Sequence, residues 1–138
     1  MGLDQTAQKI KTTYDLESKT TTLIKTEIAD WRKHNRLHGW MEELYYKKSS
    51  NPKEVFNCDD LFLHEEDLDE LEKTLKNQEL PTTEGFFFGT DSYIDDLDED
   101  GEVVYSYVRD ELPNDLQFIK DARKALKDGY DVVYSCWW

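Results

Sequence analysis

The residues best suited to chemistry lie in one segment, Trp31–Trp40, which sets tryptophan, arginine, lysine and histidine side chains close together. If a helix begins near Asn35, its N-terminus and these cations form a reasonable seat for a phosphate or carboxylate. The two tryptophans could stack on a base or ring beside that anion. A second aromatic run, Gly85–Gly89, lacks the lysine and glycine spacing of a phosphate loop, and its glycines would let backbone approach a helix or ligand closely. The candidate ligand-binding residues are therefore Trp31, Arg32, His34, Arg36, His38, Trp40, Phe86 and Phe88.

The same segment has two other interpretations. His34 and His38 are four residues apart and, with Cys58 or an aspartate, could hold zinc. The neighbouring cations oppose a metal, and the H-E-x-x-H pattern is absent, so no metal site or cofactor is expected. Alternatively these side chains cap the helix start or bond to the sheet. The Gly85–Gly89 run has its own structural interpretation as a buried central strand.

The acidic run Asp96–Gly101 resembles the first half of a calcium loop, with carboxylates at alternate positions and a glycine for the turn. Tyr107 stands where such loops place a bidentate glutamate, and the flanking residues look like strands. A solvated hairpin turn is the preferred interpretation, and Asp96, Asp98 and Asp100 are only a weak calcium candidate. The predicted interaction surface comprises Asp95, Asp96, Asp98, Asp100 and Trp138.

Helical and strand patterns alternate irregularly along the chain, and this mixture predicts an α+β fold that positions these residues. We expect a frayed N-terminus over residues 1–9, and a single domain over 10–138 with one mixed, mainly antiparallel sheet and about three helices. A turn is predicted at Asp15–Lys19, and Asn35 is the expected N-cap of the first helix. The predicted helices are 35–47, 65–76 and 114–127, and the main predicted strands are 55–63, 85–89, 101–109 and 130–138.

The chain has 138 residues and a formal charge of −14, which is unevenly distributed. Residues 1–50 hold 9 basic and 7 acidic side chains, whereas residues 51–138 hold 8 and 24. This charge repels DNA and RNA, so direct nucleic-acid binding is disfavoured and basic partners are attracted. No apolar run is long enough for a membrane span, and no signal pattern begins the chain. Cys58 and Cys136 are expected to be reduced, buried thiols.

The aromatic segments resemble a family of small proteins of tailed bacteriophages, including phages that infect cyanobacteria. The resemblance spans about residues 28–138 in order and does not include the N-terminal 27 residues. Some family members are labelled phosphoglycerate kinase, but this chain is far too short for that enzyme and lacks its nucleotide site. The matching segments are Trp31–Met41, Phe56–Cys58, Leu80–Thr83 with Gly85–Gly89, Asp115–Ile119 and Tyr134–Trp138.

The resemblance implies a phage source and the host bacterial cytoplasm as the compartment, and the residues carry no catalytic constellation. We therefore expect a non-enzymatic protein for host takeover or counter-defence. It would bind a host protein or sequester a small anionic, nucleotide-like signalling molecule. The alternative is a small enzyme acting on a nucleotide or other phosphorylated metabolite, with His34 or His38 as acid–base and Arg32 and Arg36 as clamps. The oligomeric state stays open.

Overall fold

The computed structural model describes residues 3–49, 56, 60–81, 95–97, 103–105 and 111–138, and the account below concerns these residues. The fold is α+β, as the sequence predicts, with helices and strands mixed along the chain. The elements are β1 (Asp4–Asp15), β2 (Thr20–Arg32), α1 (Asn35–Lys48), β3 (Asp60–Leu63), α2 (Glu65–Lys76), β4 (Asp95–Leu97), β5 (Val103–Tyr105), α4 (Leu112–Lys127) and β6 (Asp131–Trp137).

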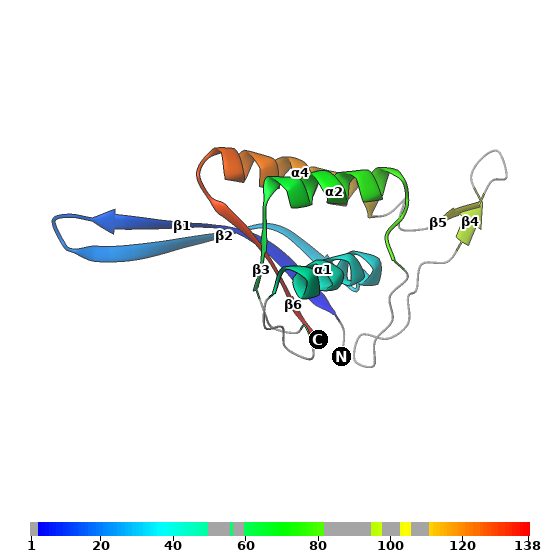
Figure 1. The fold of residues 1–138 in the computed structure, drawn as a ribbon, viewed down its shortest axis with the longest axis horizontal. Coiled ribbons are helices and arrows are strands. Elements are labelled where there is room, and N and C mark those ends of the chain that lie inside the picture. The colour runs from blue at the N-terminus through cyan, green and yellow to red at the C-terminus, as the bar shows by residue number, and fades with distance from the viewer. Residues whose placement is uncertain (1–2, 50–55, 57–59, 82–94, 98–102, 106–110) are drawn as a thin grey trace.

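Four strands form one antiparallel sheet in the order β2-β1-β6-β3 (Figure 1). The C-terminal strand β6 is therefore central, between the N-terminal strand β1 and the short strand β3. Strands β4 and β5 form a separate antiparallel pair. Figure 1 shows α2 and α4 side by side on one side of the sheet.

The core lies on one face of the sheet. Side chains of a strand alternate between its two faces, so every second residue of each strand points to the core. On β6 the core-facing residues are Val132, Tyr134 and Cys136, and Leu61 and Leu63 of β3 lie opposite Tyr134 and Val132. All three helices contribute apolar side chains to this same core cluster. Their buried apolar residues are Leu37 and Met41 of α1, Leu68, Leu71 and Leu75 of α2, and Phe118, Ile119, Ala122 and Ala125 of α4.

Helix ends follow their local sequence. Helix α2 begins with three acidic residues, which suit the positive end of the helix dipole, and Asp67 accepts the backbone N–H of His64 at 2.8 Å. Pro113 occupies the first turn of α4, where its missing N–H costs nothing. Gly129 follows the end of α4 with φ of 89°, a left-handed conformation that favours glycine, and the chain turns there into β6. These boundaries agree with the sequence-based expectations for α2 and α4.

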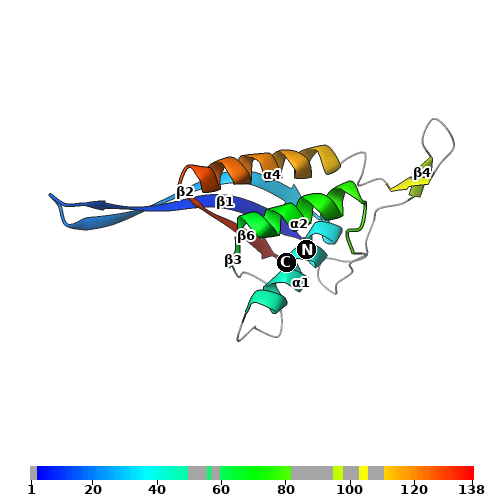
Figure 2. The ribbon, with the colours of Figure 1, turned by 45° about the horizontal axis from the view of Figure 1, so that its top comes forward.

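Strands β1 and β2 continue beyond the sheet as a two-stranded ribbon, here called the arm and defined as residues 11–24. Figures 1 and 2 both show it projecting away from the helices. The pairing of β1 with β6 ends at Ile10, whereas β1 and β2 stay in register as far as Asp15 and Thr20. The turn predicted at Asp15–Lys19 closes the arm.

Several sequence-based expectations are wrong in detail. Residues 4–9 are not frayed: they belong to β1, which is paired on both sides, and Leu3 is buried. His34, not Asn35, occupies the N-cap of α1, and Asn35 is the first helical residue. Of the strand predicted at 55–63, Asp60–Leu63 form β3 and Phe56 lies outside any strand, while residues 55 and 57–59 lie outside the described residues. The predicted strand 85–89 lies outside the described residues.

Candidate functional site

A network of buried polar side chains joins the start of α1 to β1. Lys33 has φ of 57°, which turns the chain from β2 into α1, and its N–H donates to the Leu3 carbonyl at 2.7 Å. The Gln5 side-chain amide then hydrogen-bonds to both the N–H and the carbonyl of the next residue, His34. Its oxygen accepts the His34 N–H at 2.9 Å, and its nitrogen donates to the His34 carbonyl at 3.2 Å. The helix start is thus held by a side chain of β1, which the sequence pattern did not single out.

Asp115 is the anionic centre of this network. Its two carboxylate oxygens accept hydrogen bonds from Trp31 Nε1 at 2.8 Å and His34 Nε2 at 2.7 Å. Asp115 and His34 are fully buried, and Trp31 packs edge-on against Phe118 of α4 with centroids 5.1 Å apart. A buried carboxylate is tolerated when such donors satisfy it. Asp115 therefore joins β2, α1 and α4.

Tyr134 continues the network toward the surface. Its hydroxyl accepts from Gln5 Nε2 at 3.0 Å and lies 3.1 Å from His38 Nδ1. Burial lowers the pKa of His38 to about 4, and burial also raises the pKa of Tyr134 well above its usual value. At neutral pH both are uncharged, and the His38 tautomer sets which of the two atoms is the donor. His38 Nε2 lies 3.7 Å from the carboxylate of Glu42, which is partly exposed.

The predicted cationic grip is not assembled. Arg36 is buried in the first turn of α1, whereas Arg32 is exposed and pairs in register with Asp4, on the sheet face opposite to Trp31. Two guanidinium groups placed on different sides of the sheet do not clamp one anion. The structure brings together Trp31, His34 and His38, but as fully or almost fully buried members of the network. Phe86 and Phe88 lie outside the described residues.

The histidines do not converge on a metal either. His34 points to Asp115 and His38 to Tyr134, and Cys58 lies outside the described residues. Ligand atoms of His34, Glu111 and Asp115 do lie within 4.8 Å of one another, a spacing compatible with one ion. Both Asp115 oxygens already accept hydrogen bonds, one from His34 itself. The His34–Asp115 hydrogen bond accounts for the closeness of two of these three groups.

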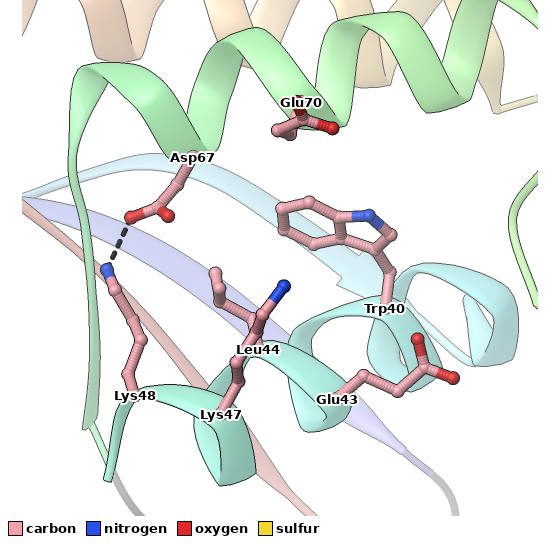
Figure 3. Close-up of a pocket in the computed structure, with 7 residues that line it drawn as sticks. All are labelled: Trp40, Glu43, Leu44, Lys47, Lys48, Asp67 and Glu70. Atoms are coloured by element: carbon pink, nitrogen blue, oxygen red, sulfur yellow. Dashed lines mark hydrogen bonds and ion pairs between the residues drawn. The ribbon is translucent and has the colours of Figure 1, made fainter.

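Trp40 is separate from the network and lines a cleft between α1 and α2 (Figure 3). The acidic side chains of Glu43 and Glu70 flank the indole ring, and Lys48 is paired with Asp67 across the cleft. Three carboxylates line this cleft against two lysines, Lys47 and the Asp67-paired Lys48, and this balance disfavours a phosphate there. The stacking role predicted for Trp40 would therefore suit a neutral or cationic group better than a nucleotide.

The sheet face away from the core carries most of the exposed large apolar side chains, and we call it the helix-free face. Among the described residues seven large apolar side chains are exposed, and register places four of them here. Phe62 is 47% exposed and lies opposite Val133, while Trp137 is 67% exposed two positions beyond Ser135. Tyr14, 58% exposed, and Leu23, 55% exposed, extend the same face along the arm. Thr6 and Ser135 hydrogen-bond between these apolar groups at 3.1 Å.

The predicted interaction surface differs from this face. Trp137, not Trp138, is the exposed member of the terminal pair, because Trp138 packs against the core and donates Nε1–H to the Phe56 carbonyl at 3.2 Å. Asp95 and Asp96 belong to strand β4, and Asp98 and Asp100 lie outside the described residues. The Cys136 thiol is buried, as predicted, and lies 3.6 Å from that same Phe56 carbonyl.

Sequence reasoning missed Gln5, Asp115 and the face that unites Phe62 with Trp137. The alternation of side chains along a strand separates its two faces. Which residues of different strands share a face depends on the strand order and register, which the sequence does not show. Within the described residues no helix is long and apolar enough to cross a bilayer. Comparison of the chain with protein-family models, curated proteins and solved structures finds no match.

Proposed function

We propose that the chain is a non-enzymatic bacteriophage protein that acts in the host cytoplasm by binding a host protein through its helix-free face. The observation that carries this proposal is that four of the seven exposed large apolar side chains among the described residues lie on that face, Phe62 and Trp137 on its four-stranded part and Tyr14 and Leu23 along the arm. Exposed apolar side chains scattered singly are ordinary, but several on one face mark an interaction site. The phage source and the compartment rest on the family resemblance of the aromatic segments.

The composition of the face suits a protein partner. Tryptophan, tyrosine and phenylalanine are enriched at interface centres, where a few large anchors supply most of the binding free energy. Threonine and serine hydroxyls between them can satisfy polar groups of the partner. The net charge of −14 opposes a nucleic-acid partner and favours one with a basic surface.

Two competing functions are less well supported. Sequestration of a small anionic molecule needs accessible cations beside an aromatic ring, but Arg36 is buried, Arg32 lies on the other face, and carboxylates flank Trp40. An enzyme acting on a phosphorylated metabolite needs His34 or His38 within reach of a substrate. Both imidazoles are fully buried and bonded to Asp115 or Tyr134.

The test is affinity capture from a bacterial host lysate with the full chain as bait, followed by mass spectrometry of protein and small-molecule eluates. Trp137→Ala and Phe62→Ala remove the two anchors on the four-stranded part of the face. Tyr46→Ala is the matched control, since Tyr46 is an exposed aromatic on α1. Unfolding curves establish that each bait is folded.

We expect one host protein to be retained by the wild type and by Tyr46→Ala, and to be lost from both face variants. Retention of that protein by both face variants would contradict the assigned surface. Recovery of an anionic metabolite, bound equally by wild type and face variants, would favour sequestration instead.

A further inference from the structure

The outer edge of the arm is a β-strand that no other strand or helix of the described residues covers. Strand β2 is the edge strand of the sheet, and its residues Thr20–Glu27 are all exposed. This stretch reads TTTLIKTE, rich in β-branched residues, without proline and with only one lysine inside the strand. Such an edge offers unpaired backbone donors and acceptors to another strand. A two-stranded ribbon is also marginal by itself, whereas three or more strands are stable.

Charge separates the arm from the rest of the chain. Residues 11–24 hold two lysines and two acidic residues, a net charge of zero, so the remainder carries the whole charge of −14. Two copies of this protein therefore repel each other through their bodies but not through their arms. Pairing between arms is the contact that lets two copies meet without bringing the acidic bodies together.

We propose that two copies form a symmetric dimer by antiparallel pairing of their β2 edges, centred on Leu23. The partner is a second copy of this chain, and the product is a four-stranded ribbon in the order β1-β2-β2-β1. The contact uses the backbone edge of β2 and leaves Phe62 and Trp137 of the helix-free face open. Leu23, at the dimer axis, also belongs to that face, so the host partner is tested separately through Phe62 and Trp137.

Side-chain complementarity favours the register centred on Leu23. A two-fold axis there sets Leu23 opposite Leu23, Thr21 opposite Lys25, and Lys19 beside Glu27 of the other copy, because side chains directly opposite in an antiparallel pair share a face. Shifting the centre to Thr22 would place Lys19 opposite Lys25. A centre at Lys25 would oppose the two Lys25 ammonium groups. The Leu23 register alone pairs opposite charges at both ends and an apolar pair in the middle.

The same geometry keeps the bodies apart. Leu23 lies two residues before Lys25, the partner of Ile10, where the four-stranded sheet begins. In the antiparallel dimer the β6 strands of the two bodies are five strand spacings apart, about 24 Å, which exceeds a Debye length of about 8 Å at physiological salt. Their repulsion is therefore screened in this arrangement.

Sedimentation of the full chain over a concentration series tests the proposal. We expect a concentration-dependent dimer in the wild type and at least about a tenfold weaker dimer in Leu23→Lys, which sets like charges opposite each other at the axis. Lys19→Glu or Glu27→Lys alone should weaken the dimer, and the two changes together should restore it. Lys120→Glu on α4, an exposed lysine of the body, is the charge-matched control and should leave the dimer unchanged.

Two further measurements separate this dimer from other associations. Leu23→Cys should form an intermolecular disulfide under mild oxidation, while the wild type should not. Raising salt from about 0.15 M to about 1 M should change the arm dimer little, whereas it would strongly favour a body-to-body contact. A chain that stays monomeric at every concentration, a dimer insensitive to Leu23→Lys, or a charge swap that restores nothing would overturn the proposal.

Discussion

Acid should destabilise the fold through His38. Burial lowers the pKa of its imidazole from an ordinary 6.5 to about 4, so the unfolded chain binds a proton between these values that the folded chain does not. The stabilising contribution is complete above pH 6.5 and is lost as the pH falls toward 4. A difference of 2.5 pKa units corresponds to about 3 kcal/mol in the free energy of unfolding at the acid end of this window.

Denaturant unfolding of wild type and His38→Gln, measured from pH 7 to pH 4.5, isolates the contribution of His38 to the pH dependence of the free energy of unfolding. Glutamine can still form a hydrogen bond with the Tyr134 hydroxyl, and it does not titrate. The variant should therefore be less stable than the wild type at pH 7, but it should lose less stability on acidification. Glu42 acts in the opposite direction, because burial and neighbouring Glu43 raise the pKa of its carboxyl and acid relieves that cost. Both proteins are therefore also compared in a Glu42→Gln background. Parallel pH profiles for the two proteins would refute the buried, neutral His38.

Four further substitutions test the network and the surface by denaturant unfolding. Asp115→Ala should cost about 3–5 kcal/mol, since it leaves the buried indole N–H and imidazole without their acceptor, and a loss below about 1 kcal/mol would argue against that role. Arg36→Ala should cost about 1–3 kcal/mol and Arg32→Ala less than about 0.5, because only Arg36 is buried; equal losses would contradict their placement. Arg123→Ala removes surface ion pairs to Asp69 and Glu72 and should cost at most about 1 kcal/mol, an effect that added salt should erase.

The sequence predicted the helices well because their signals are local. The Leu68, Leu71 and Leu75 stripe fixes the buried face of α2, and Gly129 marks the end of α4, as expected. The start of β1 was predicted to be frayed because the run Asp4–Gln8 is mostly polar. Its strand structure depends on pairing with β6. A pairing partner more than a hundred residues away in the sequence does not change the local residue pattern from which a strand is predicted.

The site was harder to predict than the fold. Cations and aromatics in Trp31–Trp40 suggest a ligand, but the same residue types also build a buried network when a distant carboxylate, here Asp115, accepts their hydrogen bonds. Trp138 was the predicted interaction residue, but Trp137 is the exposed member of the pair and Trp138 packs against the core. Which of them is exposed depends on which face of β6 the helices cover.

The affinity of the captured host protein for the full chain, compared between wild type and Trp137→Ala, tests the central claim most directly. Calorimetry with the purified partner should show a loss of at least about 2 kcal/mol, roughly thirtyfold, because a large exposed aromatic anchor is removed from the interface. Tyr46→Ala should bind as the wild type does. An unchanged affinity for Trp137→Ala and for Phe62→Ala, with both variants folded, would contradict binding through the helix-free face.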